Sequence, residues 1–320
     1  MSEIIIEKAG LLSTIQDCGR VGYQRFGMPI SGAMDVYSLK FANIIVGNEP
    51  GAAAIEATLI GPEIFFPADT VFSVCGSGMT PSVNGNAVPM YVAISAKRGD
   101  KLTFSALGYG CRAYIAFAGG LDVPLIMGSR STYLRAKIGG LNGRALVAGD
   151  RIPLGTTDTY GISGIIARQQ SQPQFHIPEY QSEQPIRIIP GPEVKRLGFD
   201  GIRTLLTSEF QITGQSDRMG IRLSGPTIQI KTGAGGHDII SAGISPGTIQ
   251  LPGNGQPIIL MADRQTTGGY ARIANVASID LTRVAQLRPG DKIRFQEISI
   301  KKAQEELKKN SIFVLSTVPL

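Results

Sequence analysis

The sequence predicts an all-β protein with few helices, and three observations lead to this fold class. The 320 residues include 40 glycines and 19 prolines, which interrupt the chain at short intervals. Between them lie short runs of alternating or β-branched residues, the pattern of half-buried strands. Many short strands separated by turn signals are typical of β-barrels and β-sandwiches. The length allows one large or two ordinary domains, each with its own core.

The predicted strands follow one another along the whole chain. They are EIIIE, TVFSV, MYVAIS, KLTFSA, AYIAFA, IRIIP, IRLSG, TIQIK, GTIQL, PIILMA and KIRFQEI. Only two helices are predicted. One covers residues 34–46, where Gly47 is placed to end it. The other covers residues 300–309, where Ser299 is placed to cap its N-terminus.

A repeated turn and a polar stretch predict two domains. The Gly-Asp turn of Lys97–Phe104 resembles that of Leu287–Phe295, and Ala148–Pro153 is a shorter version. Residues 156–184 are polar and suit a linker. We therefore expect a boundary near residue 170, which gives domains of residues 1–170 and 171–320, the second with the C-terminal helix.

Composition indicates a soluble globular protein and excludes several classes of function. Hydrophobic residues make up 42% and charged residues 18%. No apolar run approaches the roughly 18 residues that a membrane span needs. The N-terminus MSEIIIEKAG is unlike a secretory signal, so a cytoplasmic location is expected. Three scattered cysteines are expected to be buried or free thiols, and with only two histidines no metal site is expected.

The net charge of +6 is spread along the chain. Nucleic-acid binding would favour a basic stripe with stacking aromatics, and the chain has no Trp. We expect the positive field to attract small anions instead. The chain also has no G-x-x-x-x-G-K-[ST] phosphate loop. Its G-x-S-x-G match carries Pro246 where a serine hydrolase needs a backbone N–H.

Four dense polar clusters remain as candidate sites. Each joins glycines, which let the backbone approach a ligand, to an arginine, whose planar fork suits carboxylates and phosphates. Any one of them could be a turn network, but four together favour a ligand site because buried polar groups must be paired. They are residues 14–35, 128–143, 216–222 and 261–270.

These clusters carry a resemblance to a known family. The segments TIQDCGRVGY, SGAMD, AGGLDVPLIMGSRST, SDRMGIRLSGP and ADRQTTGGY are similar to the biotin-dependent carboxyltransferase / allophanate hydrolase subunit 2 family, which includes KipA and the C subunit of 5-oxoprolinase. The resemblance covers residues 4–297. It implies two cyclophilin-like β-barrel domains and a function on a small amide substrate, with no nucleic-acid or membrane partner.

The preferred function that the resemblance implies is the C subunit of an ATP-dependent 5-oxoprolinase, a hydrolase of cyclic amides. Its partners would be a KipI-like B component and a LamB/YcsF-like A component, its cofactor ATP with Mg²⁺ at the level of the complex, and the chain alone would be inactive. Biotin is not required in this interpretation, because the chain has no Met-Lys-Met attachment site. Two alternatives stay open: a carboxyltransferase for urea or another amide with a separate biotin carrier, and a KipA-like regulator of a KipI-like kinase inhibitor.

The site residues are assigned within the four clusters. Asp263 is expected to accept the amide N–H and act as general base, alternatively only to pair with Arg264 or cap a turn. Arg264 is expected to bind an anionic group, and Gln265 to orient the amide. Further substrate-binding residues are expected to be Thr266, Thr267, Gly268, Gly269, Tyr270, Gln16, Asp17, Arg20, Asp35, Arg130, Ser131, Arg218 and Arg222.

Overall fold

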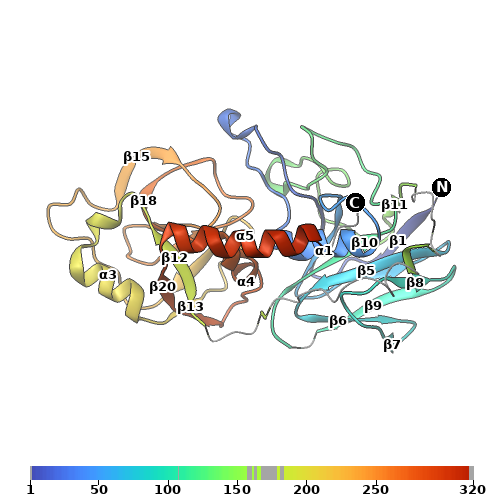
Figure 1. Ribbon diagram of the computed structural model, residues 1–320. Coiled ribbons are helices and arrows are strands. Elements are labelled where there is room, and N and C mark those ends of the chain that lie inside the picture. Colours follow the sequence, from blue (N-terminus) through green and yellow to red (C-terminus); the bar gives the residue numbers. More distant parts are fainter. Residues whose placement is uncertain are drawn as a thin grey trace. The chain divides into compact units, whose positions relative to one another are not determined.

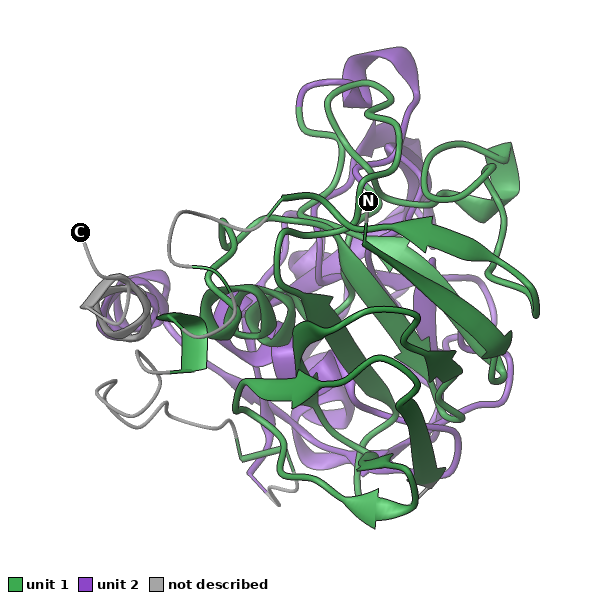
Figure 2. Ribbon diagram, turned by 90° about the vertical axis from the view of Figure 1, so that its right-hand side faces the viewer, with its two compact units in different colours: residues 1–21, 31–181, 317–320 green, residues 22–30, 182–316 purple. Residues whose placement is uncertain are grey.

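The computed structural model describes residues 2–106, 108–156, 161, 164–166, 179–180 and 184–316. These residues divide into two compact units (Figure 2). Unit 1 comprises the described residues within 1–21 and 31–181, and unit 2 those within 22–30 and 182–316. The predicted boundary near residue 170 lies outside the described residues. Strands dominate both units, so the all-β fold class is confirmed (Figure 1).

Unit 1 contains two antiparallel sheets. The six-stranded sheet has the order β11-β1-β4-β9-β6-β7, and the five-stranded sheet has the order β2-β3-β10-β5-β8. The strands are β1 Glu3–Lys8, β2 Leu12–Gln16, β3 Ala54–Thr58, β4 Glu63–Phe65, β5 Thr70–Gly76, β6 Met79–Val83, β7 Asn86–Ala87, β8 Ile94–Ala96, β9 Lys101–Ala106, β10 Arg112–Phe117 and β11 Arg151–Pro153. The short 3-10 helix η2 spans Leu134–Ala136.

The core of unit 1 follows from the alternation seen in the sequence. In β1, Ile4 and Ile6 are fully buried, while the alternate residues Glu3, Ile5 and Glu7 are partly exposed. They join one apolar cluster with residues of the five-stranded sheet, such as Ile55 of β3 and Ile115 of β10. Helix α1, Val36–Ile45, packs against β5 and β10. It ends before Gly47, which has a positive φ of 77°, as predicted.

Unit 2 is built on one nine-stranded sheet. Its order is β19-β13-β14-β17-β16-β18-β12-β20, and β15 also pairs with β18. The pairs are antiparallel apart from β12 with β20. The strands are β12 Ile186–Pro190, β13 Phe210–Ile212, β14 Gly220–Ser224, β15 Asp238–Gly243, β16 Thr248–Leu251, β17 Ile258–Leu260, β18 Thr267–Val276, β19 Lys292–Ile293 and β20 Phe295–Glu297.

Unit 2 contains a longer C-terminal helix than predicted and further helices that were not predicted. Helix α5 spans Ile300–Ser316, and the Ser299 hydroxyl caps it by accepting from the Lys302 N–H at 3.2 Å. Two further helices, α3 at Gly198–Thr207 and α4 at Leu281–Ala285, were not predicted. The remaining short helices are the 3-10 turns η1 Gln24–Phe26, η3 Val194–Arg196 and η4 Ser278–Asp280.

Two strand predictions were wrong in whole or in part. The stretch TIQIK, residues 227–231, is not a strand, because its backbone lies against helix α3 and a turn. The Ile228 N–H donates to Gly255, and a Cβ on Gly201 of α3 would lie 2.5 Å from the Gln229 carbonyl oxygen. In MYVAIS only Ile94 onward is a strand, since Tyr91 has a φ of 60°.

The repeated Gly-Asp motif forms the same turn three times. In each copy the aspartate carboxylate accepts from the N–H three residues before it, at 2.7 Å for Asp100, 2.8 Å for Asp150 and 2.9 Å for Asp291. The glycine before each aspartate has a φ between 91° and 95°. The motif is therefore a structural turn that starts a strand rather than a ligand site.

No helix among the described residues is long and apolar enough to cross a membrane.

Candidate functional site

In unit 1, the Asp17 carboxylate joins two of the predicted clusters. Asp17 follows β2 directly, and its Oδ1 accepts from the hydroxyls of Ser129 at 2.7 Å and Ser131 at 2.5 Å, and from the Gly19 N–H at 2.7 Å. Its Oδ2 accepts from the Arg130 N–H at 2.5 Å. The side chain is almost fully buried. Segments more than 100 residues apart are thus held together by one carboxylate.

Gln16 and Arg20 belong to the same network. The Gln16 amide donates to the Thr14 hydroxyl at 2.9 Å and to the Thr132 carbonyl at 3.1 Å. Arg20 is fully buried and donates to the Ser131 carbonyl. Because these side chains are enclosed, their contacts shape the loops around them, and Arg130 is the member of this group that reaches a cavity.

Asp35 lies apart, at the N-terminus of helix α1. Its carboxylate accepts from the Ser38 N–H at 3.1 Å and the Ser38 hydroxyl at 2.7 Å, which is an N-cap. The Tyr114 hydroxyl links its N–H to the buried Glu56. Burial raises the pKa of Tyr114 well above its ordinary value, so this hydroxyl stays protonated. Asp35 is fully buried, and these contacts make it the N-cap of α1.

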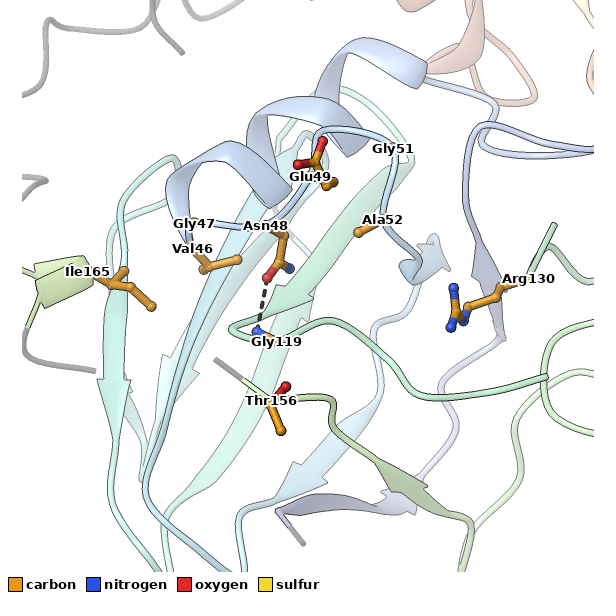
Figure 3. Close-up of a pocket in the computed structure, with 10 residues that line it drawn as sticks. All are labelled: Val46, Gly47, Asn48, Glu49, Gly51, Ala52, Gly119, Arg130, Thr156 and Ile165. Carbon is orange, nitrogen blue, oxygen red and sulfur yellow. Dashed lines mark hydrogen bonds between the residues drawn. The ribbon is translucent and has the colours of Figure 1, made fainter. Parts of the chain in front are cut away.

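A cavity of about 580 Å³ opens in unit 1 beside this network (Figure 3). It lies between the end of α1, the loop that follows it and the turn after β10. Its lining residues are Val46, Gly47, Asn48, Glu49, Gly51, Ala52, Gly119, Arg130, Thr156 and Ile165. The Asn48 amide fixes this wall, accepting from the Gly119 N–H at 2.9 Å and donating to the Phe117 carbonyl at 2.8 Å.

In unit 2, the stretch Met261–Tyr270 forms a turn and the start of a long strand. Strand β17 ends at Leu260, a turn follows, and β18 begins at Thr267. The Asp263 N–H donates to the Arg218 carbonyl at 2.9 Å. The side chains of the same two residues form a bidentate ion pair, Nε to Oδ2 at 3.0 Å and Nη2 to Oδ1 at 3.1 Å. Asp263 therefore pairs with Arg218 and not with its neighbour Arg264.

Arg264 is a buried cation that pairs with no carboxylate among the described residues. Only 2% of the residue is exposed, and its guanidinium donates to the carbonyls of Ile244 at 3.3 Å and Met261 at 3.2 Å. Burial lowers the pKa of Arg264 to about 10, so the group remains charged at neutral pH. Its Nη2 has no acceptor in the part of the chain described. A buried cation held this way is suited to binding an anion.

The other residues of the stretch take separate places. Gln265 donates weakly to the Gln250 amide oxygen at 3.5 Å. Thr266 lies in the turn, where its carbonyl accepts from the Ile244 N–H. The residues from Thr267 to Tyr270 start β18 and pair with β15.

Gly268 and Gly269 differ, because a Cβ on Gly268 would lie 2.5 Å from the Gln250 amide, whereas Gly269 has room. A side chain at position 268 would therefore require the Gln250 side chain to shift. Arg222 is exposed on β14. The roles predicted for the site residues stay predictions.

The described residues contain no group of three or more His, Cys, Asp or Glu side chains that could hold a metal ion. The three cysteines are free thiols.

Comparison with known proteins identifies the family. The model of the carboxyltransferase domain, subdomains A and B, matches residues 26–297. The chain belongs to this carboxyltransferase family. The resemblance seen in the polar clusters is thereby confirmed.

Members of the family include full-length relatives and parts of larger enzymes. The chain is 38% identical to the C subunit of 5-oxoprolinase from Escherichia coli over 93% of this chain and 92% of that protein. It is 36% identical to the C subunit of 5-oxoprolinase from Haemophilus influenzae over 94% and 93%. The structure of Kluyveromyces lactis urea carboxylase superposes with a TM-score of 0.86 at 30% identity, over 98% of this chain and 29% of that one.

Apart from Arg130, none of the lining residues was a predicted site residue, and three of those missed have polar side chains: Asn48, Glu49 and Thr156. Asn48 and Glu49 follow the predicted helix end at Gly47, and a polar loop at a helix end is a usable signal. Thr156 is the first residue of the stretch predicted as a linker, and no sequence feature marked it as a site residue.

Proposed function

We propose that this chain is the C subunit of an ATP-dependent 5-oxoprolinase, which converts 5-oxoproline to glutamate together with its A and B components. The observation that carries the proposal is the match to two proteins named as the C subunit of 5-oxoprolinase over nearly the full length of all three chains. The urea carboxylase match, by contrast, covers less than a third of that enzyme. Two waters are consumed: one adds to the carbonyl carbon as the lactam C–N bond breaks and the nitrogen leaves as the amine of glutamate, and the other balances the conversion of ATP to ADP and phosphate.

The amide carbon is unreactive, and ATP activates it so that water can attack. ATP with Mg²⁺ is proposed as the cofactor of the complex as a whole. Biotin has no role in this reaction. The KipI-like B component and the LamB/YcsF-like A component complete the proposed assembly, which acts in the cytoplasm.

Asp263 is proposed to hold the lactam N–H. Arg218 takes one lone pair from each Asp263 oxygen and fixes the orientation of the carboxylate. The carboxylate so oriented is proposed to accept the amide proton, first in a hydrogen bond and then as general base. Preorganisation by the ion pair spares the carboxylate a reorientation during reaction.

Arg264 is proposed to stabilise the negative charge that develops on the lactam oxygen or on the phosphoryl group that reacts with this oxygen. The guanidinium is buried, charged and anchored by two backbone carbonyls. A fixed cation in a site shielded from water stabilises developing charge more than a hydrated one does. Gln265 and the hydroxyls of Thr266 and Thr267 are proposed to orient the amide.

The test is reconstitution of the complex. The chain is co-expressed with the KipI-like and LamB/YcsF-like components, and glutamate formation is measured with 5-oxoproline and ATP while each protein is omitted in turn. We expect glutamate only when this chain is present. Equal glutamate formation without the chain would contradict the proposal.

A second function, carboxyl transfer from a separate biotin carrier to urea or another amide, is favoured by the family model and by the urea carboxylase structure. It predicts incorporation of labelled bicarbonate into the amide when a biotinylated carrier and its carboxylase are added. A firm complex with the KipI-like component that supports neither reaction would instead favour the regulatory alternative.

A further inference from the structure

The cavity of unit 1 has two charged side chains in its wall, Arg130 and Glu49. Figure 3 shows the Arg130 guanidinium on the cavity side of its chain, while the Glu49 carboxylate is turned away from Asn48 and Gly119. The one charge directed into the cavity is therefore positive. The cavity volume of about 580 Å³ lies within the roughly 300–1,000 Å³ usual for small-molecule sites.

Hydrogen bonds fix the backbone and the Nε of Arg130 and leave its two terminal guanidinium nitrogens facing the cavity. Its N–H donates to Asp17 at 2.5 Å, its carbonyl accepts from the Gly140 N–H at 2.9 Å, and its Nε donates to the Val123 carbonyl at 2.8 Å. In the part of the chain described, its two terminal nitrogens have no acceptor. The side chain is thus fixed at Nε while two N–H-bearing nitrogens face the cavity.

Among the described residues, the Asp17 carboxylate binds the backbone N–H of Arg130 and forms no ion pair with its guanidinium. Both oxygens of Asp17 are taken by the backbone N–H groups of Gly19 and Arg130 and by the hydroxyls of Ser129 and Ser131. Asp17 therefore positions the loop that carries Arg130 without pairing with its side chain. The Thr156 hydroxyl in the same wall can add a donor to a bound anion.

We propose that this cavity binds the carboxylate of a small amide that also carries an acid group, with Arg130 as its anchor. The inference rests on the proposed function, for which 5-oxoproline is such a compound. It assigns binding of the substrate carboxylate to Arg130 in unit 1, as an alternative to substrate binding at Asp263 and Arg264 in unit 2. A single guanidinium forms a bidentate pair with one carboxylate. A triphosphate is disfavoured, because its several negative charges would meet a single cation.

The experiment compares two lactams on the full chain by titration calorimetry or NMR. 5-Oxoproline and 2-pyrrolidinone share the ring and differ in the carboxylate. We expect 5-oxoproline to bind at least about tenfold more tightly, the usual gain from a charge-assisted contact. Arg130→Gln should remove that advantage and leave 2-pyrrolidinone unaffected. The control is Arg98→Gln, an exposed arginine of the same unit, which should change neither affinity.

A second variant tests the cavity without touching the arginine. Ala52 lines the wall, and Ala52→Leu should weaken both lactams by narrowing the space. Circular dichroism spectra that match the unaltered chain establish that each variant is folded. Equal binding of the two lactams, or full 5-oxoproline affinity in Arg130→Gln, would overturn the proposal. Displacement of 5-oxoproline by equimolar inorganic phosphate would assign the cavity to a phosphate instead and overturn it too.

If the chain alone binds neither lactam, the Michaelis constant of the reconstituted complex tests the cavity assignment. Arg130→Gln should then raise KM for 5-oxoproline at least about tenfold while kcat changes less. An unchanged KM in a complex that makes glutamate would overturn the cavity assignment and leave the proposed function standing. Conversely, Arg130-dependent binding of 5-oxoproline in a complex that makes no glutamate would overturn the function and support the cavity.

Discussion

Replacing Asp263 by alanine should destabilise unit 2 strongly, because it breaks a buried ion pair. The side chains of Arg218 and Asp263 are only 6% and 7% exposed and are joined by two hydrogen bonds of 3.0 and 3.1 Å. Removing one partner of such a pair leaves the other charge buried without its counterion. That costs about 3–5 kcal/mol. Exposed pairs contribute roughly 0–1 kcal/mol, because water solvates and screens both charges.

The chain offers a matched control in the same unit. Arg203 and Asp200 on helix α3 form the same kind of pair at 3.1 Å, with side chains 62% and 80% exposed. Asp200→Ala should therefore have little effect on stability. A double variant, Arg218→Met with Asp263→Leu, replaces the buried pair by apolar groups and should regain much of the loss.

The measurement is urea unfolding followed by circular dichroism. With a slope of about 2 kcal/mol per molar urea, Asp263→Ala should lower the midpoint by roughly 1.5–2.5 M. Asp200→Ala should leave it within about 0.5 M. A midpoint for Asp263→Ala as high as that for Asp200→Ala would refute the reasoning, since the pair would then be no stronger than an exposed one.

Three other predictions follow from the described contacts. In the reconstituted complex, Asp263→Asn keeps the shape but removes the base, so kcat for glutamate formation should fall at least about 100-fold; unaltered turnover would rule the base out. Asp17→Asn turns one acceptor into a donor facing the Arg130 N–H at 2.5 Å, so it should cost about 1–3 kcal/mol, seen as a Tm lower by roughly 2–10 °C; an unchanged Tm would contradict this. Bonds from Arg272 hold the pKa of Glu193 below its ordinary value, so its stabilisation is present above the unfolded pKa of about 4.3 and is lost as pH falls through the lower folded pKa. Glu193→Gln should thus be less stable than the unaltered chain near pH 7, with the difference shrinking below about pH 4; a pH-independent difference would argue against the ion pair.

The predictions of local structure succeeded where the signal lies within a few residues. Alternation placed β1 and β9, and Ser299 caps its helix as predicted. Helix α3 was missed because Gly198 and Gly201 weaken its helix propensity. Gly201 is explained only by packing, since the backbone at Gln229 approaches too closely for a Cβ. The same contact accounts for the failed strand prediction at residues 227–231.

The sequence by itself determined the fold class and the family, because strand periodicity and long polar motifs are properties of consecutive residues. It also placed the functional candidates in four clusters. Only the tertiary structure decided which side chains meet. Asp263 pairs with Arg218, 45 residues away, and Asp17 binds Ser131, 114 residues away.

These partners lie on segments that sheet pairing and loop packing bring together, and spacing along the chain does not encode that proximity. For the same reason the sequence could not predict that Asp35 caps a helix or that Arg130 faces a cavity. Nor could it predict that Arg264 is buried without a carboxylate partner among the described residues.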